Sequence, residues 1–558
     1  MKNWLNWRSN GVTYVKLTAV LALYFALVLN APIYKELHRL FAEMDSVKLG
    51  FILSIPLFFF AALNLIFNLL SWPFLTKPLF VALMILSALV SYAGYNYDTI
   101  FNVDMIANIM QTDSSEASAY LSCYSVLWVV LLGFVPAALL ISLPLKREPW
   151  FKFIGKKLLS ILASVLILVV IAGSYYQDYA SFGRNHSYLK KMIVPTQPVY
   201  AISRYVKQTY FTTPQPYIEL GLDAHQSSEA LAQAKEKPSL VVLVVGETAR
   251  SQNYQLNGYS RETNPYTADL DVVSFQEVRS CGTATAVSLP CMFSRLTHDN
   301  YDHDHANNQD NVLDILNRAG VSMIWEDDDG GDKNVARHIE KQMMDRSRKD
   351  SECDGNTCYD MVLLENLDRN INKLSGNRMV ALHLIGSHGP TYYKRYPKSM
   401  AVFQPDCPRA DIENCSNEQI VNSYDNSIRY TDYVLSKVIN RLSELQQQYN
   451  TALIYLSDHG ESLGEGGMYL HGAPYALAPD YQTTVPMIVW MSQGFQQAKS
   501  VDYACLKQRA AIHGQYSHDN LFHSLLGIMD VKTKAYQSSL DIFAACRVEP
   551  QHEELAKG

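Results

Sequence analysis

This sequence has no excess of basic residues and has little charge in its first part, and both features limit the functions that it can have. The 54 Asp and Glu residues outnumber the 47 Lys and Arg residues and give a formal net charge of -7. A nucleic-acid-binding domain favours a basic face, so no nucleic-acid partner is predicted. Charge is also scarce before residue 180, where almost all long apolar runs lie. The 558 residues therefore predict more than one domain, the first of them apolar.

Five apolar segments of the first part are long enough and poor enough in charge to cross a membrane. A buried core helix is the alternative for any one of them. Five in succession make that alternative weak, because no amphipathic partner is present to cover them. The predicted spans are Leu17–Tyr34, Gly50–Trp72, Pro78–Tyr95, Leu121–Leu145 and Leu158–Tyr176.

The basic residues around these spans predict their orientation. The loop from Asn96 to Tyr120 contains no Lys or Arg, and the first loop is the one that departs from the pattern, with Lys35, Arg39 and Lys48. Basic residues gather instead before the first span and in two short turns, at Lys2, Arg8, Lys77, Lys146, Arg147, Lys152, Lys156 and Lys157. By the positive-inside rule the N-terminus is cytoplasmic, and five crossings place everything after residue 176 outside.

Cysteine is almost absent from the first part, where Cys123 stands alone. The other eight follow residue 280, and three close pairs suit disulfides in an oxidising compartment: Cys281–Cys291, Cys353–Cys358 and Cys407–Cys415. Zinc ligation is the competing interpretation, but the sequence has no CxxC pair. A Cys505–Cys546 bridge stays open, because Cys123 could compete for either thiol.

The chain after the last span divides into a linker and a soluble domain. Residues 177–237 mix aromatic, basic and proline residues, and predict either bridging helices at the membrane surface or an ordinary linker. From residue 238 apolar runs alternate with helical patterns, which predicts an α/β domain with a mostly parallel sheet over 238–558. The predicted strands are Ser239–Val245, Met379–Ile385, Thr451–Leu456 and Val485–Trp490, and the predicted helices include Asn311–Ala319 and Asn422–Tyr449.

Polar groups that can bind a metal ion follow three of these strands. In a parallel sheet, ligands bind beyond the carboxyl ends of the strands. The mixture of Asp, Glu and His suits Zn²⁺. The groups are Glu247-Thr248 after the first strand, Ser387-His388 after the second, and Asp458-His459 after the third, with His471 shortly beyond.

A nucleophilic hydroxyl is predicted in the segment from Ser280 to Cys291. Small residues there precede an apolar run, as at the start of a helix, and a helix N-terminus stabilises negative charge on an attacking oxygen or a phosphate. Metal coordination lowers the pKa of a hydroxyl, so that it can attack without a strong base. From spacing alone Thr283, Thr285 and Ser288 are all candidates.

Five motifs in order resemble the bacterial phosphoethanolamine–lipid A transferases of the alkaline phosphatase and sulfatase superfamily. The resemblance extends over nearly the whole chain, including five spans before a periplasmic domain. The motifs are Gly246-Glu247-Thr248-Ala249-Arg250, Asn257-Gly258-Tyr259, Ser280-Cys281-Gly282-Thr283-Ala284-Thr285, Gly386-Ser387-His388-Gly389-Pro390 and Ser457-Asp458-His459-Gly460-Glu461-Ser462-Leu463-Gly464.

The resemblance implies a role for each of several residues. Thr285 would be the nucleophile that carries phosphoethanolamine, and one Zn²⁺ would be held by Glu247, Thr285, Asp458 and His459. His388 and His471 match a pair that binds the donor phosphate or a second metal ion, or serves as acid and base. Lys333 matches a basic residue near the donor phosphate. A further set spaced four apart, Asn108, Thr112 and Glu116, shares one helix face and matches positions near the ethanolamine group.

The implied reaction moves phosphoethanolamine from phosphatidylethanolamine to a phosphate of lipid A, in a monomer anchored in the bacterial inner membrane with its catalytic domain in the periplasm. Modified lipid A would carry less negative charge and bind polymyxin-type cationic peptides more weakly. Four alternatives stay open: another acceptor (a lipopolysaccharide core sugar, a glucan or a protein), phosphoglycerol transfer, simple hydrolysis with water as acceptor, and a catalytically silent lipid-binding or sensor protein.

Overall fold

The computed structural model describes residues 11–42, 44, 47–112, 117, 120–146, 148–211 and 216–548. Its contacts divide the chain into two compact units. One consists of Met1–Ile106 and Leu121–Thr212, and the other of Ala107–Tyr120 and Thr213–Gly558. Each unit has its own apolar core, as expected for separately folded parts of one chain.

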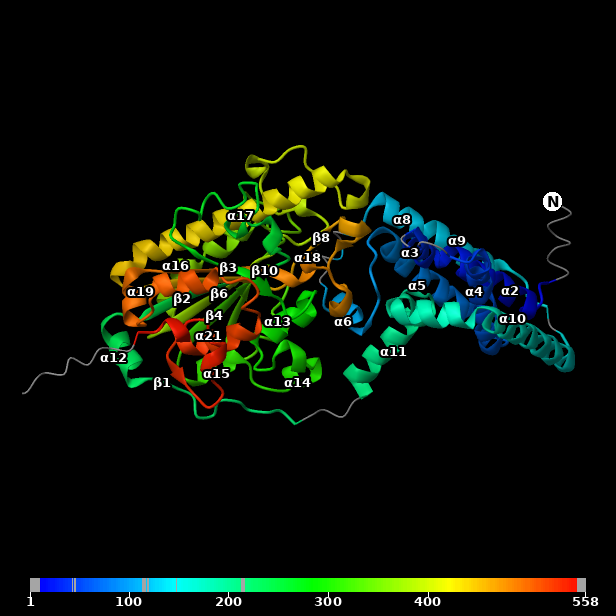
Figure 1. Ribbon diagram of the computed structural model, residues 1–558, viewed down its shortest axis with the longest axis horizontal. Coiled ribbons are helices and arrows are strands. Elements are labelled where there is room, and N and C mark those ends of the chain that lie inside the picture. The colour runs from blue at the N-terminus through cyan, green and yellow to red at the C-terminus, as the bar shows by residue number, and fades with distance from the viewer. Residues whose placement is uncertain are drawn as a thin grey trace, which may run out of the picture. The chain divides into compact units, whose positions relative to one another are not determined.

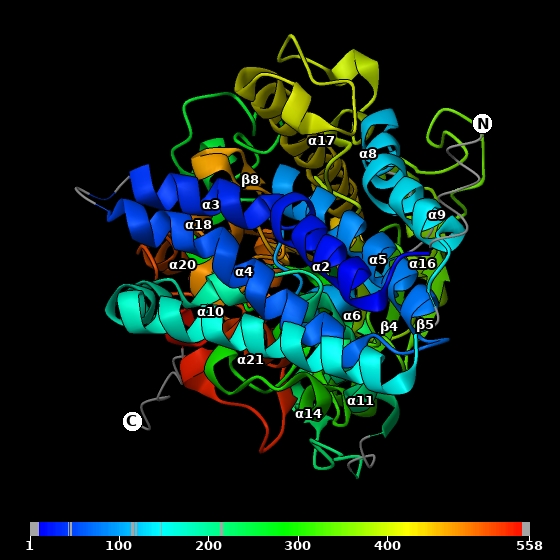
Figure 2. The same ribbon diagram turned by 90° about the vertical axis from the view of Figure 1, so that its right-hand side faces the viewer.

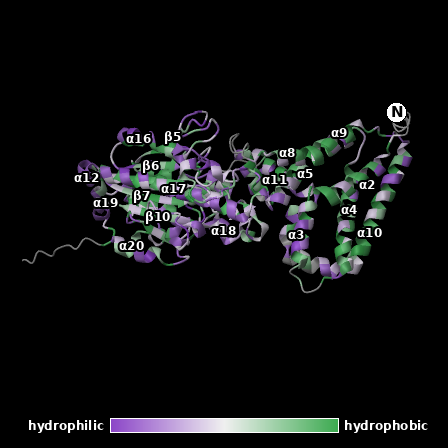
Figure 3. Cartoon of the chain, turned by 90° about the horizontal axis from the view of Figure 1, so that it is seen from above, coloured by the Kyte–Doolittle hydropathy of each residue, from purple (hydrophilic) through white to green (hydrophobic). Residues whose placement is uncertain are grey.

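The first unit is helical. Four helices in the described part of the chain are long and apolar enough to span a membrane: α4 (Leu49–Leu70), α5 (Thr76–Asn96), the segment Cys123–Ser142, and the Trp150–Tyr179 part of α10 (Trp150–Asn185). The bent pair Tyr14–Leu29 and Ala31–Ala42 makes a fifth if it counts as one span. Figure 3 shows the hydrophobic colour along α2 (Tyr14–Tyr24), α4, α10 and α9 (Val135–Ser142).

The first predicted span, Leu17–Tyr34, falls on this bent pair and is not one straight helix. The chain bends by 51° between Leu29 and Ala31. The buried Asn30 side chain explains the bend, because its amide donates to the carbonyl oxygens of Phe25 and Val194 (both 2.8 Å) and its oxygen accepts from the Val194 N–H (3.0 Å). These bonds give partners to the Phe25 carbonyl at the bend and to the backbone of Val194, which lies against it.

The Cys123–Ser142 segment contains a π-helical turn, Val130–Phe134, between α8 (Cys123–Val129) and α9. Pro136 lacks the N–H that would have bonded the Leu132 carbonyl four residues earlier. The Tyr24 hydroxyl donates to that carbonyl instead, at 2.5 Å. A side chain from another helix thus satisfies the backbone group that proline leaves open.

Polar side chains also join α4 to α10, which lie side by side in Figure 2. The Asn64 amide donates to the hydroxyls of Ser160 and Ser164, at 3.1 and 2.9 Å. Such bonds hold apolar helices together where the hydrophobic effect does not distinguish helix from lipid. Beyond α10 the chain continues as a 3₁₀ turn (Ser187–Met192) and as α11 (Thr196–Phe211).

The second unit is built on a seven-stranded sheet with the order β3-β10-β7-β2-β6-β4-β5. The strands β7 (Asn450–Ser457), β2 (Ser239–Gly246), β6 (Arg378–His383), β4 (Ser322–Asp327) and β5 (Glu340–Met343) are parallel. β10 (Thr484–Met491) is antiparallel to both β7 and β3 (Val273–Arg279). The four predicted strands are present, and the mostly parallel α/β class is confirmed.

Helices cover both faces of this sheet, as Figure 1 shows. The long helix α17 (Asn417–Glu444) lies on one face, and α13 (Thr285–Phe293), α15 (Val312–Arg318) and α21 (Asp519–Ile528) lie on the other. Every residue of β2, β6, β7 and β10 is buried, which explains their continuous apolar runs. A separate two-stranded sheet pairs β1 (His225–Gln226) with β11 (Val531–Lys532).

The second unit contains four disulfides: Cys281–Cys291, Cys353–Cys358, Cys407–Cys415 and Cys505–Cys546. Cys123 is a free, exposed thiol and does not compete for Cys505 or Cys546. The last bridge closes the longest loop, with a sequence separation of 41 residues against 5 for Cys353–Cys358.

Loop length predicts how much each bridge stabilises the second unit. By the loss of chain entropy in the unfolded state, replacing both Cys505 and Cys546 by Ala should cost about 4 kcal/mol, against about 2 kcal/mol for Cys353 and Cys358. Thermal unfolding of the full chain in detergent, without reductant, should show the larger drop in melting temperature for the 505/546 pair. Equal drops would contradict the loop-entropy explanation.

Candidate metal and phosphoryl-transfer site

The carboxyl ends of four neighbouring parallel strands meet at one edge of the sheet. Glu247 follows β2, Asp458 follows β7, Asp327 ends β4, and the Gly386–Pro390 segment follows β6 after two further residues. Because β2 lies between β7 and β6, Glu247 is at the centre of this edge. The topology therefore brings together polar groups that are up to 211 positions apart in the sequence.

Thr285 reaches this edge from a strand that the sequence patterns did not reveal. β3 ends at Arg279, the Ser280 N–H donates to the Thr483 carbonyl (2.8 Å), and the Cys281–Cys291 bridge ties the following turn to α13. Thr285 is the first residue of α13. Its side chain therefore lies at a helix N-terminus, where the backbone N–H groups favour a negatively charged oxygen.

The Thr285 hydroxyl lies within a buried group of acids and histidine. Its Oγ1 is 3.0 Å from Glu247 Oε2 and 3.4 Å from His459 Nε2. His459 Nε2 is in turn 3.4 Å from Glu247 Oε1 and 3.5 Å from Asp458 Oδ2. Glu247, Asp458 and His459 are fully buried, and one ligand atom from each lies within 4.8 Å of the others.

The donor atoms of this group fit a metal ion. Asp458 Oδ2 is buried without a hydrogen-bond partner, while Asp458 Oδ1 accepts from the N–H groups of Thr248 (3.2 Å) and His459 (2.7 Å). His459 Nδ1 lies 2.9 Å from the Gly460 carbonyl, so it carries the proton of the neutral ring and leaves the Nε2 lone pair facing the carboxylates. Two carboxylates, an imidazole nitrogen and a hydroxyl make a donor set of the kind that Zn²⁺ binds.

The electrostatics of the group require a positive charge. Burial raises the pKa of Asp458, and the Glu247 carboxylate raises it further. Burial also opposes ionisation of Glu247, but His459 outweighs it, so the pKa of Glu247 falls well below its usual value. The two carboxylates overcome the effect of burial on His459 and raise the pKa of its ring to about 10. A proton on His459 or a bound cation can thus neutralise the site.

The backbone around Glu247 is strained and closely packed. Thr248 has a φ of 59°, a left-handed conformation that is costly for a β-branched residue. Its hydroxyl donates to Glu247 Oε1, and its carbonyl accepts from the Tyr424 hydroxyl at 2.7 Å. Gly386, with φ 50°, approaches so closely that a Cβ there would lie 2.6 Å from the Glu247 carbonyl oxygen. These contacts fix the carboxylate in one orientation.

The three hydroxyls that spacing alone did not separate lie in different places. Thr283 Oγ1 donates to the Ala473 carbonyl (2.6 Å), and the Ser288 hydroxyl donates to the Asp458 carbonyl. Of the three, Thr285 is the one that contacts Glu247 and His459. His518, which the sequence patterns missed, supports this segment: its Nδ1 accepts from the Cys281 N–H, and burial lowers its pKa to about 3. It is therefore neutral and structural.

His388 and His471 lie beside the same group. Their ring centroids are 5.4 Å apart, and the His471 ring is 4.5 Å from that of His459. Glu461, fully buried, places Oε2 3.3 Å from His471 Nδ1, and burial raises the pKa of this carboxyl to about 8. Glu461 belongs to the last of the five motifs, but the resemblance implied no role for it. Its titration near neutral pH, in contact with a histidine, makes it a candidate participant in proton transfer.

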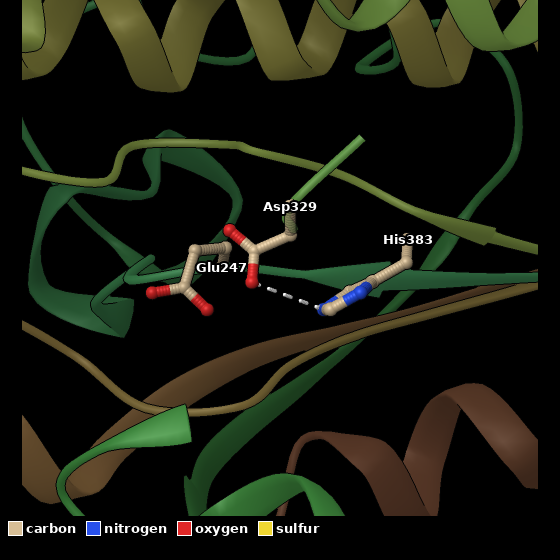
Figure 4. A group of neighbouring side chains, drawn as sticks. All are labelled: Glu247, Asp329 and His383. Carbon is tan, nitrogen blue, oxygen red and sulfur yellow. Dashed lines mark ion pairs between the residues drawn. The ribbon is translucent and has the colours of Figure 1, made fainter. Parts of the chain in front are cut away.

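A second buried group shares Glu247 and consists of Glu247, Asp329 and His383 (Figure 4). His383 Nδ1 is 2.9 Å from Asp327 Oδ2, and His383 Nε2 is 3.7 Å from Asp329 Oδ2. No residue of this group except Glu247 was selected from the sequence. A histidine at the end of the otherwise apolar run Met379–Leu384 was the signal that could have drawn attention to it.

For the predicted substrate-binding residues Lys333, Asn108 and Thr112, no contact with the Thr285 group is seen among the described residues. Lys333 is half-buried with a φ of 45°, and its aspartate neighbours pair with other bases: Asp332 with Lys341, Asp328 with Arg346 and Asp327 with His383. Asn108 lies in α6 (Val103–Gln111), and the Thr112 hydroxyl donates to its carbonyl at 2.9 Å. Glu116 lies outside the described residues.

The like charges of Asp458 and Glu247 predict a stability effect in metal-free protein. Because folding raises the pKa of Asp458, its stabilising contribution is present below the unfolded pKa of about 4 and is lost as the pH rises through the folded value. Asp458→Asn keeps an oxygen for the Thr248 and His459 N–H groups and removes the charge. In EDTA the stability of the variant relative to the parent should rise by roughly 1–3 kcal/mol between pH 5 and pH 8.

Thermal melting at both pH values measures this difference. With added Zn²⁺ the order should reverse, because the parent gains a bound ion that the variant holds weakly. A stability difference that stays the same at pH 5 and pH 8 in EDTA would show that burial and the Glu247 charge do not raise the pKa of Asp458.

Comparison with known proteins agrees with this geometry. The "Sulfatase" family model matches residues 239–531, and the "Phosphoethanolamine transferase EptA/EptB" model matches residues 59–210. The chain is 40% identical to phosphoethanolamine transferase EptA of Escherichia coli K12 over 531 residues, 94% of this chain and 96% of that protein. It is 35% identical over 495 residues to phosphatidylethanolamine transferase Mcr-1 of Escherichia coli, 87% of this chain and 91% of that protein.

A solved structure is similar over its full length. The integral membrane protein lipooligosaccharide phosphoethanolamine transferase A (EptA) from Neisseria meningitidis superposes with a TM-score of 0.92 at 38% identity, covering 97% of this chain and all of that one. The matches thus include both the apolar helices and the sheet domain with its site. This chain belongs to the EptA family of membrane-bound phosphoethanolamine transferases, with a C-terminal domain of the sulfatase fold.

Proposed function

We propose that this protein transfers phosphoethanolamine from phosphatidylethanolamine to a phosphate group of lipid A, with Thr285 as the covalent carrier. The observation that supports this most directly is the Thr285 hydroxyl at the first residue of α13, 3.0 Å from Glu247 and 3.4 Å from His459. It occurs in a chain whose relatives, matched over nearly their whole length, are phosphoethanolamine transferases.

Glu247, Asp458, His459 and the Thr285 hydroxyl would hold one Zn²⁺, which when bound lowers the pKa of the hydroxyl and offsets charge on the phosphoryl oxygens. The chain itself orients these donors. Asp458 is fixed by two backbone N–H groups, and His459 by the Gly460 carbonyl. Thr248 and the backbone of Gly386 hold Glu247 from the other side.

The first half of the reaction forms a bond from Thr285 Oγ1 to phosphorus while the bond from phosphorus to the diacylglycerol oxygen breaks. Glu247, which accepts the hydrogen bond of the threonine hydroxyl, lies where its proton must leave. The departing diacylglycerol oxygen takes a proton from His388 or His471, the latter in contact with Glu461. Backbone N–H groups at the start of α13 favour the negative charge of the phosphoryl oxygens.

The second half reverses these steps with a new acceptor. A phosphate oxygen of lipid A attacks the phosphorus, the bond to Thr285 Oγ1 breaks, and the hydroxyl is restored. Lys333 would bind the donor phosphate, and Asn108, Thr112 and Glu116 the ethanolamine ammonium group. We infer that the protein acts as a monomer. Donor and acceptor are both lipids, so an enzyme anchored in the inner membrane with its catalytic domain in the periplasm meets both at the bilayer.

The consequence for the cell surface follows from charge. Capping a lipid A phosphate with phosphoethanolamine adds an ammonium group and lowers the net negative charge of the outer leaflet. Cationic peptides of the polymyxin type bind such a surface by ionic attraction, so their affinity falls. The protein would therefore reduce sensitivity to these antibiotics.

Replacing the nucleophile tests donor, acceptor and carrier together. The parent, expressed in a bacterium that lacks such enzymes, should add a phosphoethanolamine mass increment to isolated lipid A. Thr285→Ala should abolish it, because loss of a hydroxyl nucleophile costs on the order of 10⁶-fold in rate. Thr285→Ser keeps a hydroxyl at the same position and should retain part of the increment. Mass spectrometry of isolated lipid A provides the measurement.

The outcome separates the acceptors. If a folded, zinc-loaded parent adds nothing to lipid A, the lipid A assignment is wrong, and core sugars, glucans and proteins become the acceptors to examine. If Thr285→Ala still modifies lipid A while Thr283→Ala or Ser288→Ala does not, the carrier has been wrongly assigned.

A further inference from the structure

The structure contains a second cluster of metal-ligating side chains, in which Asp329 and His383 have no part in the proposed reaction. Its members are Glu247, Asp329 and His383, with one ligand atom from each within 4.8 Å of the others. In Figure 4 the two carboxylates lie next to each other and the His383 ring faces Asp329. Glu247 belongs to both clusters, so a single carboxylate can bridge two ions.

Strand register brings these residues together. His383 is paired with Val245 of β2 and with Asp327 of β4, so these three side chains point to the same face of the sheet. Glu247 is the first residue after β2, and Asp329 lies in the turn that follows β4, where its N–H donates to Asp327 Oδ1. The β2-β6-β4 strand order thus brings His383, Glu247 and this turn to the same edge of the sheet.

His383 has the orientation of a metal ligand. Its Nδ1 is 2.9 Å from Asp327 Oδ2, which holds the ring in place and directs Nε2 toward Asp329. His383 is fully buried, and its Nε2 has no hydrogen-bond partner. Bulk water does not reach such a position to replace the missing partner. A carboxylate that fixes one ring nitrogen while the other binds the ion is the usual arrangement around metal-bound histidines.

Asp327 is itself firmly held. Its Oδ2 also accepts from the Trp325 indole N–H at 2.9 Å, and its Oδ1 accepts from the N–H groups of Asp329, Gly330 and Gly331. Both carboxylate oxygens of Asp327 are therefore occupied by hydrogen bonds that orient its neighbours. Asp329, Glu247 and His383 Nε2 are left to face one another.

The charges around the cluster favour a cation. Three carboxylates, those of Glu247, Asp327 and Asp329, are buried around the His383 imidazole, while Lys333 acts on Asp329 and His459 on Glu247 from outside the cluster. With a neutral His383 ring, the negative charge of the three carboxylates exceeds the positive charge that these two neighbours supply. Burying such charge without compensation is costly. A divalent cation balances it, and the mixture of imidazole and carboxylate donors suits an ion of the zinc type.

We propose that Glu247, Asp329 and His383 form a second divalent-cation site, joined to the Thr285 site through the shared Glu247 carboxylate. This second site rests on the proposed function only because the two sites share the Glu247 carboxylate. It is a different site from the one that His388 and His471 would form with a second metal ion. An ion there would fix Glu247 against the opposing pull of the first ion and add positive charge close to the transferred phosphoryl group.

Metal content of the full chain in detergent tests this proposal. The protein is stripped with chelator, equilibrated with a small excess of Zn²⁺, freed of unbound metal and analysed by elemental mass spectrometry. The parent should hold two equivalents. Asp329→Asn and His383→Gln should each hold one, and so should Asp458→Asn, while the Asp329→Asn/Asp458→Asn double variant should hold none. His388→Gln, the matched control for the alternative second ion, should keep two.

Each outcome decides between the sites. Two equivalents retained by both Asp329→Asn and His383→Gln, or a second equivalent lost in His388→Gln, would overturn the second site. The second site would also be overturned if the parent held one equivalent that Asp458→Asn loses and His383→Gln keeps. That result would leave the zinc of the proposed function intact. No bound zinc in a folded parent would overturn both. Asp329→Asn does not touch the His383–Asp327 bond, so it reports on the site even if His383→Gln unfolds the domain.

Discussion

The buried carboxylate of Glu247, at the end of the central strand β2, imposes the main constraint on the second unit. Burial makes its negative charge unfavourable, and the surrounding structure supplies what the charge requires. His459 faces one oxygen, the Thr285 hydroxyl donates to the other, and Thr248 adds a further hydrogen bond. A site that holds a charge this way is pre-organised, because little has to move when substrate or metal binds.

The scaffold behind Glu247 explains why the arrangement is rigid. β2 lies between β6 and β7 with every residue buried, so the positions of Asp458 and Gly386 relative to Glu247 follow from strand pairing. Thr285 is positioned independently, by β3 and by the Cys281–Cys291 bridge at the start of α13. The strained φ of Thr248 is tolerated because hydrogen bonds on both sides fix it.

In the helical unit, side chains also complete the hydrogen bonding of groups that would otherwise lack partners. In lipid, backbone and side-chain polar groups must find partners within the protein. Asn30 satisfies the backbone where the first span bends, Tyr24 satisfies the carbonyl that Pro136 leaves open, and Asn64 joins α4 to α10. In both units, therefore, departures from regular structure coincide with side chains that complete the hydrogen bonding.

The sequence by itself determined the features that depend on neighbouring residues. Apolar runs predicted the spans and the strands β2, β6, β7 and β10, and the motifs after three of these strands identified Glu247, Asp458 and His459, because parallel strands end at a common edge. The strands β3, β4 and β5 mix polar with apolar residues, so no continuous apolar run revealed them.

Contacts distant in sequence decided the rest, and only the tertiary structure supplies them. The bend at Asn30 depends on Val194, 164 residues later, and the separate places of Thr283, Thr285 and Ser288 depend on partners in the β7–β10 region. The grouping of Asp329 and His383 with Glu247 depends on strand order, which no local pattern contains. Local periodicity records which face of an element is buried, whereas a binding site is a property of which elements lie side by side.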